Sequence, residues 1–293
     1  MLEFVRRMAH HGMRLNGATV GRQTIGGCDV GYYRLGRGKQ PALLIHGIGD
    51  RSVHWQGIAM VLRDVLDMTI PDMPGCGLST LPPGRTFISS AESRHILHTL
   101  VEPLADQRPL LIGHSLGGLF AAKMMLEAPE RYSGLVLINP GGLKLPESAR
   151  DGKIFRDFLA FGDRMEIFQR IFHQPPAFMR IVAPGIQRQL QAPVVLDFID
   201  AMHDYDMITP AEVAQLPAHG LLFLGEEDQF LPPGTLEGYA VRFPGQVTWL
   251  PNSAHASQVE CAGQIAGAIR RMLSPPARKT WVQNGGSVVT SQW

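Results

Sequence analysis

The hydrophobic positions of this 293-residue chain form short, continuous apolar runs that alternate with longer segments of helical periodicity. Short apolar runs predict strands buried on both faces, and the longer periodic segments predict helices that cover them. The predicted strands are 42–45, 67–71, 110–112, 135–138, 221–224 and 247–250, and the predicted helices are 55–66, 88–104, 119–126 and 262–273. This alternation predicts an α/β fold, with a mostly parallel sheet and helices on both faces.

Two regions depart from the alternation. Near the start, segments 19–25 and 30–35 flank Gly26-Gly27, which predicts a β-hairpin. Between residues 143 and 208 no strand pattern occurs, and large apolar side chains recur at spacings that partly suit helix faces. Six of them are phenylalanines: Phe155, Phe158, Phe161, Phe168, Phe172 and Phe178. We expect an inserted helical cap, whose apolar side chains form a core of its own, the wall of an apolar pocket, or both.

These patterns divide the chain into three parts. Residues 1–142 and 209–273 form the predicted α/β core, and residues 143–208 form the predicted cap. From residue 274 to residue 293 the apolar periodicity is lost, which predicts a flexible tail.

Composition narrows the class of protein. The net charge is +1, only 18% of residues are charged, and no basic cluster occurs, so a nucleic-acid partner is not expected. The start of the chain lacks the apolar core of a signal peptide, and no apolar run reaches the roughly 18 residues that a membrane span needs. Cys28, Cys76 and Cys261 are odd in number and widely spaced, which favours a reducing compartment. We therefore expect a cytoplasmic protein.

The segment Gly113-His114-Ser115-Leu116-Gly117 carries the most specific chemistry. It lies between a predicted strand and a predicted helix, where a serine between two glycines holds its hydroxyl out as a nucleophile. The turn is so tight that its central residue takes a strained backbone conformation and its flanking residues must be small. Ser115 is therefore the candidate nucleophile.

His255 is the favoured base among 11 histidines. It follows the last predicted strand, and an imidazole that titrates near neutral pH can take the serine proton and return it to a leaving group. His114 is adjacent to the serine, but its side chain must point elsewhere at such a turn. His46 directly precedes a glycine and is expected to brace a loop.

Asp228 is the favoured acid, with the task of accepting a hydrogen bond from the imidazole. It follows the predicted strand 221–224, and Glu226 and Glu227 are competing carboxylates in the same turn. A solvated acidic turn is the other interpretation of this segment. Asn139 follows the preceding strand and cannot supply a negative charge, which favours Asp228.

A glycine-rich loop, His46-Gly47-Ile48-Gly49, follows the strand 42–45. Such a loop leaves backbone N–H groups free to point at a ligand. Together with the N–H of Leu116 at the start of a helix, the N–H of Ile48 is expected to form an oxyanion hole, with Gly49 as the second choice of donor. A plain tight turn is the alternative.

With the serine turn, the histidine, the aspartate and the glycine-rich loop taken together, the chain resembles the α/β-hydrolase fold enzymes over most of residues 20–273. The order Ser115, Asp228, His255 is that of the family. Residues 72–79 resemble its D-x-P-G-x-G-x-S loop, which we interpret as structural, and Gly118 and His54-Trp55 also match common family patterns. The family usually carries its cap after the sixth strand, where residues 143–208 stand.

The residues predict a serine hydrolase that cleaves an ester-type bond of a small, largely apolar substrate through an acyl-enzyme, with neither metal nor organic cofactor. Thioesterase or acyltransferase chemistry uses the same intermediate. A carbon–carbon bond hydrolase of the meta-cleavage-product type is an alternative that needs polar cap groups, for which the arginines available are Arg156, Arg164, Arg170, Arg180 and Arg188. A small-molecule-binding protein on the same scaffold is a second alternative. Relatives that require an aspartate nucleophile are excluded by Ser115.

Overall fold

The structure is a computed structural model that describes residues 2–146, 148–175 and 177–274. Within them, eight strands form one sheet in the order β1-β2-β4-β3-β5-β6-β7-β8. The strands are β1 (Thr19–Ile25), β2 (Cys28–Gly36), β3 (Gln40–Ile45), β4 (Leu66–Pro71), β5 (Leu110–His114), β6 (Gly134–Ile138), β7 (Leu221–Gly225) and β8 (Gln246–Leu250). β2 is antiparallel to both of its neighbours, and the other pairs are parallel. The fold is therefore α/β with a mostly parallel sheet, as predicted.

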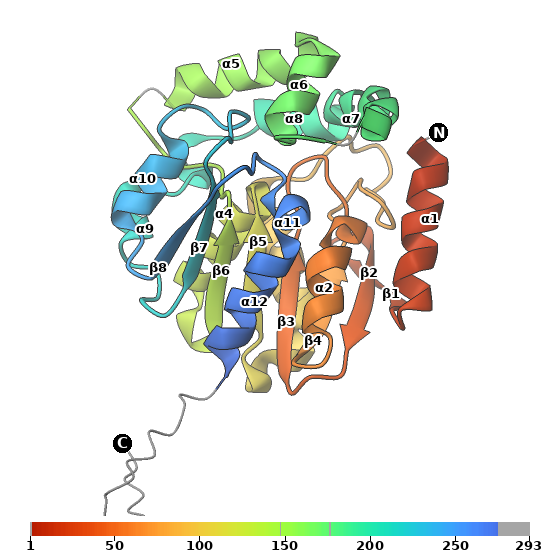
Figure 1. The fold of residues 1–293 in the computed structure, drawn as a ribbon, viewed down its shortest axis with the longest axis vertical. Helices are drawn as coiled ribbons and strands as arrows, with labels where there is room; N and C mark the ends of the chain where they lie inside the picture. Colours follow the sequence, from red (N-terminus) through yellow and green to blue (C-terminus); the bar gives the residue numbers. More distant parts are fainter. Residues whose placement is uncertain (1, 147, 176, 275–293) are drawn as a thin grey trace, which may run out of the picture.

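Helices cover both faces of the sheet (Figure 1). One face packs against α2 (Gln56–Leu62) and α12 (Ala262–Leu273), and the other packs against α3 (Ser90–Val101), α4 (Leu116–Glu127) and α10 (Thr235–Arg242). Side chains along a strand alternate between the two cores: Leu43 belongs to the α3–α4 side and Leu44 to the α2–α12 side. Burial on both faces explains why the strands have continuous apolar runs.

Four helices follow β6 and lie across the end of the sheet at the top of Figure 1. They are α5 (Ser148–Phe161), α6 (Arg164–Ile171), α7 (Ala183–Leu190) and α8 (Pro193–Asp200), which we call the overlying helices. Buried side chains from them, among them Leu159, Ile167, Leu190 and Val195, form a cluster of their own with Phe230. A single parallel bridge between Leu143 and Ile208 joins the two ends of this segment.

Two short helices complete the frame of the site. α9 (Pro210–Val213) leads into β7, and α11 (Ser257–Glu260) follows the loop after β8. The hairpin of β1 and β2 pairs from Thr19 with Arg34 to Ile25 with Cys28, as the sequence predicted.

The first helix, α1 (Leu2–Leu15), is not apparent from the sequence pattern. Its Met13 is fully buried, while His10 Nδ1 lies 2.5 Å from the hydroxyl oxygen of Tyr33 on β2. Charged residues and His10-His11 interrupt its apolar positions, so no continuous apolar run marks it in the sequence.

Two predicted helix boundaries shift for local reasons. The helix expected over 55–66 ends at Leu62, because Leu66 begins β4. The helix expected over 88–104 begins at Ser90, because the Ser89 hydroxyl caps it by accepting from the Glu92 N–H while the Glu92 carboxylate accepts from the Ser89 N–H.

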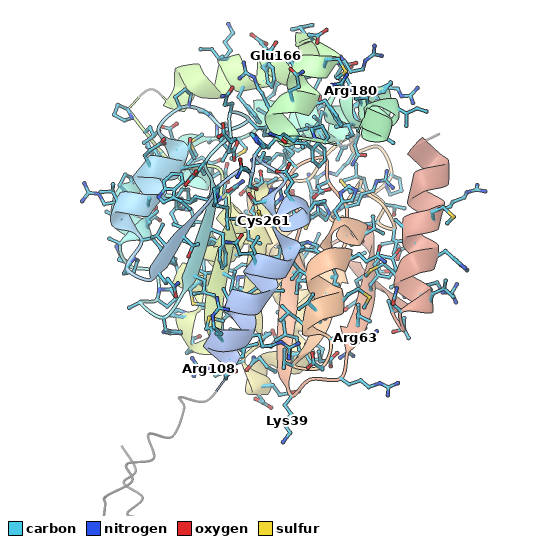
Figure 2. The ribbon with its side chains drawn as sticks, viewed as in Figure 1. Lys39, Arg63, Arg108, Glu166, Arg180 and Cys261 are labelled. Atoms are coloured by element: carbon cyan, nitrogen blue, oxygen red, sulfur yellow. The ribbon has the colours of Figure 1, made fainter. Side chains whose placement is uncertain are left out.

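The two ends of the sheet differ in what covers them. Figure 2 shows Glu166 on α6 and Arg180 in the segment between α6 and α7, and Lys39, Arg63 and Arg108 at the opposite end of the molecule. None of the described helices is both long and apolar enough to cross a membrane. Of the predicted tail, residues 275–293 lie outside the described part of the chain.

Candidate active site

Ser115 lies in the tight turn between β5 and α4, with a positive φ of 54° and a ψ of −120°. Neither flanking position has room for a side chain. A Cβ on Gly113 would lie 2.2 Å from the carbonyl oxygen of Gly117, and a Cβ on Gly117 would lie 2.2 Å from that of Ile45. Both contacts are with backbone and cannot be relieved by a rotamer change. The strained turn and its two glycines therefore have the geometry that the sequence predicted.

The structure brings Ser115, His255 and Asp228 into one hydrogen-bonded chain. The hydroxyl of Ser115 donates to Nε2 of His255 at 2.9 Å, and Nδ1–H of His255 donates to Oδ2 of Asp228 at 2.8 Å. The three residues follow β5, β8 and β7, whose carboxyl ends meet at one edge of the sheet. In this tautomer the lone pair of Nε2 faces the serine, as a general base requires.

Asp228 is separated from the neighbouring acids by its burial. Its side chain is 0% exposed, whereas Glu226 and Glu227 are exposed. Besides His255, its carboxylate accepts backbone N–H groups from Phe230 at 2.9 Å and from Leu231 at 3.4 Å. These three donors satisfy the buried carboxylate and fix its orientation toward the imidazole.

The two predicted oxyanion donors line the same cavity as Ser115. Leu116 is the first residue of α4, so its N–H has no acceptor one turn earlier in the helix. A Cβ on Gly47 would lie 2.9 Å from that of Ser115, which shows how closely the loop before Ile48 passes the serine. Gly49, in contrast, faces α7 and α8: a Cβ there would lie 3.0 Å from Leu190. Ile48 is among the residues that line the cavity of Ser115 and Gly49 is not, and the choice of Ile48 as the second donor stays a prediction.

A cavity of about 660 Å³ extends from Ser115 between the sheet edge and the overlying helices. Much of its wall is apolar, including Leu119, Leu143, Met202 and Leu231. At its far end Arg156 on α5 binds Asp200 on α8 at 3.1 Å. The volume lies within the range of small-molecule sites.

The phenylalanines of the overlying segment serve more than one purpose. Phe155 lines the cavity, Phe158 packs on the helices' own core, Phe168 packs against Phe172, and Phe161 is 80% exposed. Core and pocket wall are thus both present, as the sequence allowed. The side chain of Phe178 lies outside the described residues.

His46 and Asp72 brace the loops around the site. Nε2 of His46 accepts the Met73 N–H at 2.9 Å, and its Nδ1–H donates at 2.7 Å to the carbonyl oxygen of the next residue. The two carboxylate oxygens of Asp72 accept the N–H groups of Ser52 and Leu78, each at 2.7 Å. Both side chains are committed to backbone, in agreement with the structural roles predicted for them.

Asp50 and His54 form an ion pair just beyond the glycine-rich loop. The attraction between the two side chains outweighs the burial of Asp50, so the pKa of Asp50 lies below and the pKa of His54 above the ordinary value. Across residues 2–146, 148–175 and 177–274, no group of three or more histidine, cysteine or acidic side chains is placed to hold a metal ion.

Comparison with known proteins agrees with this geometry. A model of the alpha/beta hydrolase family matches residues 42–268. The chain belongs to the alpha/beta hydrolase family. It is 37% identical, over 116 residues, to an uncharacterized protein of Mycobacterium tuberculosis, a match that covers 39% of this chain and 33% of that protein. The chain thus spans about a third of the length of the first curated relatives that it matches.

Solved structures of the same fold include a putative lipase from Acinetobacter baumannii, with a TM-score of 0.78 and 18% identity, covering 93% of this chain and 95% of that one. Another is the 2-hydroxy-6-oxo-6-phenylhexa-2,4-dienoate hydrolase of a Rhodococcus species, with a TM-score of 0.69 and 21% identity, covering 87% of this chain and 98% of that one. At these identities the likeness shows the fold alone.

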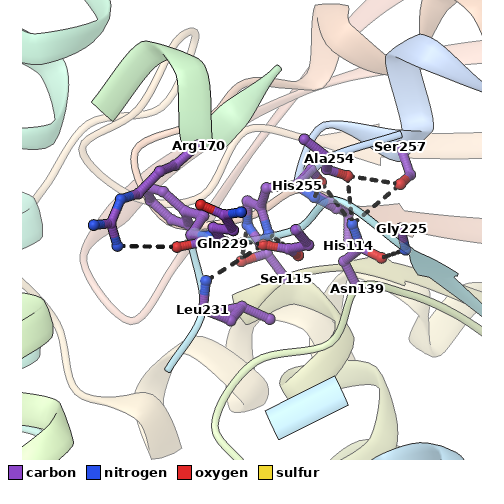
Figure 3. A network of polar contacts seen from close by, with 12 residues as sticks. His114, Ser115, Asn139, Arg170, Gly225, Gln229, Leu231, Ala254, His255 and Ser257 are labelled. Carbon is purple, nitrogen blue, oxygen red and sulfur yellow. Dashed lines mark hydrogen bonds and ion pairs between the residues drawn. The ribbon is translucent and has the colours of Figure 1, made fainter. Parts of the chain in front are cut away.

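Asn139 contributes to this alpha/beta hydrolase site in a way that the sequence does not reveal. Its Nδ2 donates to the carbonyl oxygens of Ala254 at 2.9 Å and of His255 at 3.1 Å, and its Oδ1 accepts the Gly225 N–H at 2.7 Å (Figure 3). It thereby fixes the loop that carries His255 to the end of β7. The only available signal is its position after β6, at the same sheet edge.

His114 supports the same loop from below. Its Nε2–H donates to the carbonyl oxygen of His255 at 2.8 Å, and the two rings lie 4.8 Å apart (Figure 3). Its Nδ1 is buried and has no hydrogen-bond partner among the described residues. Burial, and then the nearby His255, lower the pKa of His114 to about 3, which keeps the ring neutral. The hydrogen bond of the ring is made to the loop of His255 rather than to the serine.

Proposed function

We propose that this chain is a serine hydrolase that cleaves an ester-type bond of a small, largely apolar substrate, with residues 143–208 acting as the cap of the site. The observation that carries the proposal is the hydrogen-bonded chain from Ser115 through His255 to Asp228, which opens into a 660 Å³ cavity. A serine at a strained turn, a correctly oriented base and an adjoining apolar cavity together meet the geometric requirements of acyl transfer.

In the first half-reaction, Oγ of Ser115 attacks the ester carbonyl carbon while Nε2 of His255 takes the hydroxyl proton. Asp228 keeps the imidazole oriented and stabilises its charged form. The N–H groups of Ile48 and Leu116 stabilise the negative oxygen of the tetrahedral intermediate. The intermediate collapses, the ester C–O bond breaks, and the imidazolium gives its proton to the leaving alcohol.

In the second half-reaction, His255 takes a proton from water, and the hydroxide attacks the acyl-enzyme carbonyl. The acid leaves as Oγ of Ser115 regains its proton. No cofactor takes part. A thioester or another acyl acceptor enters by the same steps, so a panel of esters, thioesters and lactones assigns the leaving group.

The arginines of the proposed cap argue for an uncharged acyl group rather than a carboxylated dienol. Of the five, Arg156 alone is among the described residues that line the cavity. Its guanidinium is already held by Asp200 at 3.1 Å and lies 3.6 Å from Asp157. Because its charge is balanced before a substrate arrives, we expect faster turnover of neutral esters than of a vinylogous diketone in parallel assays.

Replacement of the nucleophile tests the proposal directly. Ser115→Ala is expected to lower hydrolysis of p-nitrophenyl butyrate by about 10⁴-fold or more, whereas Ser274→Ala, at the exposed end of α12, is expected to keep the wild-type rate. Equal turnover by wild type and Ser115→Ala would remove Ser115 from the mechanism.

A fluorophosphonate probe separates an enzyme from a binding protein on the same scaffold. We expect it to label wild type but not Ser115→Ala. Tight binding of a small ester without turnover and without labelling would instead assign a binding function.

We place the protein in the cytoplasm, because Cys28, Cys76 and Cys261 form no disulfide bond in the part of the chain that the structure describes. Cell fractionation with an antibody to the chain tests this location.

A further inference from the structure

The end of α6 is bonded directly to both loops that complete the candidate site. The N–H of Ala256, next to His255, donates to the carbonyl oxygen of Ile171 at 2.8 Å. Nη1 of Arg170 donates to the carbonyl oxygen of Gln229, next to Asp228, at 3.2 Å (Figure 3). One end of one helix therefore contacts the backbone beside the base and beside the acid.

Glu260, at the end of α11, adds a third connection between the same two regions. Its Oε1 accepts the N–H of His173, just after α6, at 2.8 Å, and its Oε2 accepts the N–H of Ala254, just before His255, at 2.8 Å. The two carboxylate oxygens of Glu260 thus bind two different segments, the one after α6 and the one before His255. Bonds from N–H groups to a carboxylate are stronger than those to a neutral acceptor.

Aromatic packing joins the overlying helices to the imidazole itself. The ring of Phe230 lies 4.5 Å from the ring of His255 at an angle of 30°, and Phe155 on α5 meets Phe230 edge-on at 5.3 Å. Hydrogen bonds hold the His255 backbone on one side, and this stack limits its ring on the other.

We propose that Glu260 is a positioning residue, which holds the loop of His255 against the segment after α6 so that Nε2 stays aligned with Ser115. The role rests on the proposed function, since it acts on the base of that reaction. Glu260 does not touch the cavity: its contribution is to the geometry of the reacting groups, where a small misplacement has a large effect on rate.

The conservative variant Glu260→Gln isolates this role. An amide has the same shape but only one acceptor oxygen, so it satisfies either His173 N–H or Ala254 N–H and presents its own N–H₂ to the other. Glu237→Gln makes the same chemical change at an exposed position of α10 and serves as the matched control.

For p-nitrophenyl butyrate we expect Glu260→Gln to lower kcat by about 10-fold to 100-fold with KM within about 2-fold of wild type. The rate of Ser115 labelling by a fluorophosphonate is expected to fall by a similar factor, because labelling also needs the base. The control variant is expected to match wild type in all three. A raised KM with unchanged kcat and labelling would assign Glu260 to cap attachment alone and overturn the proposal.

Arg170→Gln provides a second variant if Glu260→Gln folds poorly. It removes the contact with Gln229, together with the ion pair to Glu166 and the contact with the Phe158 ring, and is expected to lower kcat by a few-fold without raising KM. In the double variant the two losses are expected to be non-additive, because both act on the docking of one helix end. Additive losses, or kcat unchanged in both single variants while Ser115→Ala is inactive, would overturn the positioning role and leave the proposed function standing. A wild type that neither turns over esters nor is labelled contradicts the proposed function itself.

Discussion

A buried imidazole beside the nucleophile ties stability to pH at the scale of a single residue. Burial, and then the nearby His255, outweigh the attraction of the Asp50 and Asp228 carboxylates for the protonated ring, so the pKa of His114 is lowered to about 3. The unfolded chain binds a proton at this histidine below pH 6.5, whereas the folded chain does not until about pH 3. Stability contributed by the neutral ring is therefore complete above pH 6.5 and decreases as the pH falls toward 3.

We predict that His114→Gln is less sensitive to acid than wild type. Between pH 6 and pH 4 its unfolding free energy is expected to fall less, by about 1.4 kcal/mol for each pH unit. Urea unfolding at several pH values measures this, with His11→Gln on the exposed side of α1 as the control. Identical pH dependence in wild type and His114→Gln would contradict the assignment.

At the scale of single elements, the turn that carries Ser115 shows why some features are predictable from sequence. Gly113 and Gly117 are required by contacts within one strand, one turn and one neighbouring strand, so a short motif contains the whole constraint. Strands such as β3 are equally visible, because burial on both faces demands an unbroken apolar run. The helix α1 is less visible in the sequence, because charged and histidine residues interrupt its apolar positions.

Roles that depend on contacts between distant segments are not visible in the pattern. Asn139 binds the carbonyl oxygen of Ala254 across 115 positions of sequence, and Glu260 joins segments that the chain alone does not bring together. The sequence favours Asp228 by its place after a strand, whereas the burial of its carboxylate and its hydrogen bond to His255, which distinguish it from Glu226, are not visible in the periodicity of a loop. The nucleophile and base follow from local motifs and strand order, whereas the groups that hold them require the fold.

We predict that Gly117→Ala destabilises the fold by about 1–3 kcal/mol or more, since its Cβ would meet the carbonyl oxygen of Ile45 at 2.2 Å. Gly263→Ala on α12 is the matched control, because a Cβ there meets nothing within 4 Å and alanine favours helix. Thermal unfolding compares the two variants. Equal midpoints for both would show that the turn can relax around the added methyl group.

At the scale of the whole molecule, the reacting groups come from the core, whereas part of the pocket wall comes from a separate segment. Ser115, Asp228 and His255 lie in loops that follow strands of the sheet, and Phe155 and Met202 of the cavity wall lie in the segment between β6 and β7. Substitutions in this segment are therefore expected to change which ester is preferred without abolishing hydrolysis.

Met202→Trp tests this separation. The larger side chain fills part of the cavity, so kcat/KM for p-nitrophenyl octanoate is expected to fall by about 10-fold or more relative to p-nitrophenyl butyrate. Val241→Trp, on the exposed side of α10, is the control. An unchanged ratio of the two esters would place the acyl chain elsewhere.

The bridge between Leu143 and Ile208 has a consequence for how the segment between them can vary during evolution. Paired backbones lie about 5 Å apart, so the two ends of the intervening segment lie side by side outside the strands of the sheet. A segment of different length can replace this one without displacing β6 or β7, because insertions are tolerated where their two ends lie close together. Such a substitute must still present a carbonyl where Ile171 stands and an N–H where His173 stands. Related chains can therefore differ in this segment, and so in their pocket, only as long as these two backbone groups keep their positions.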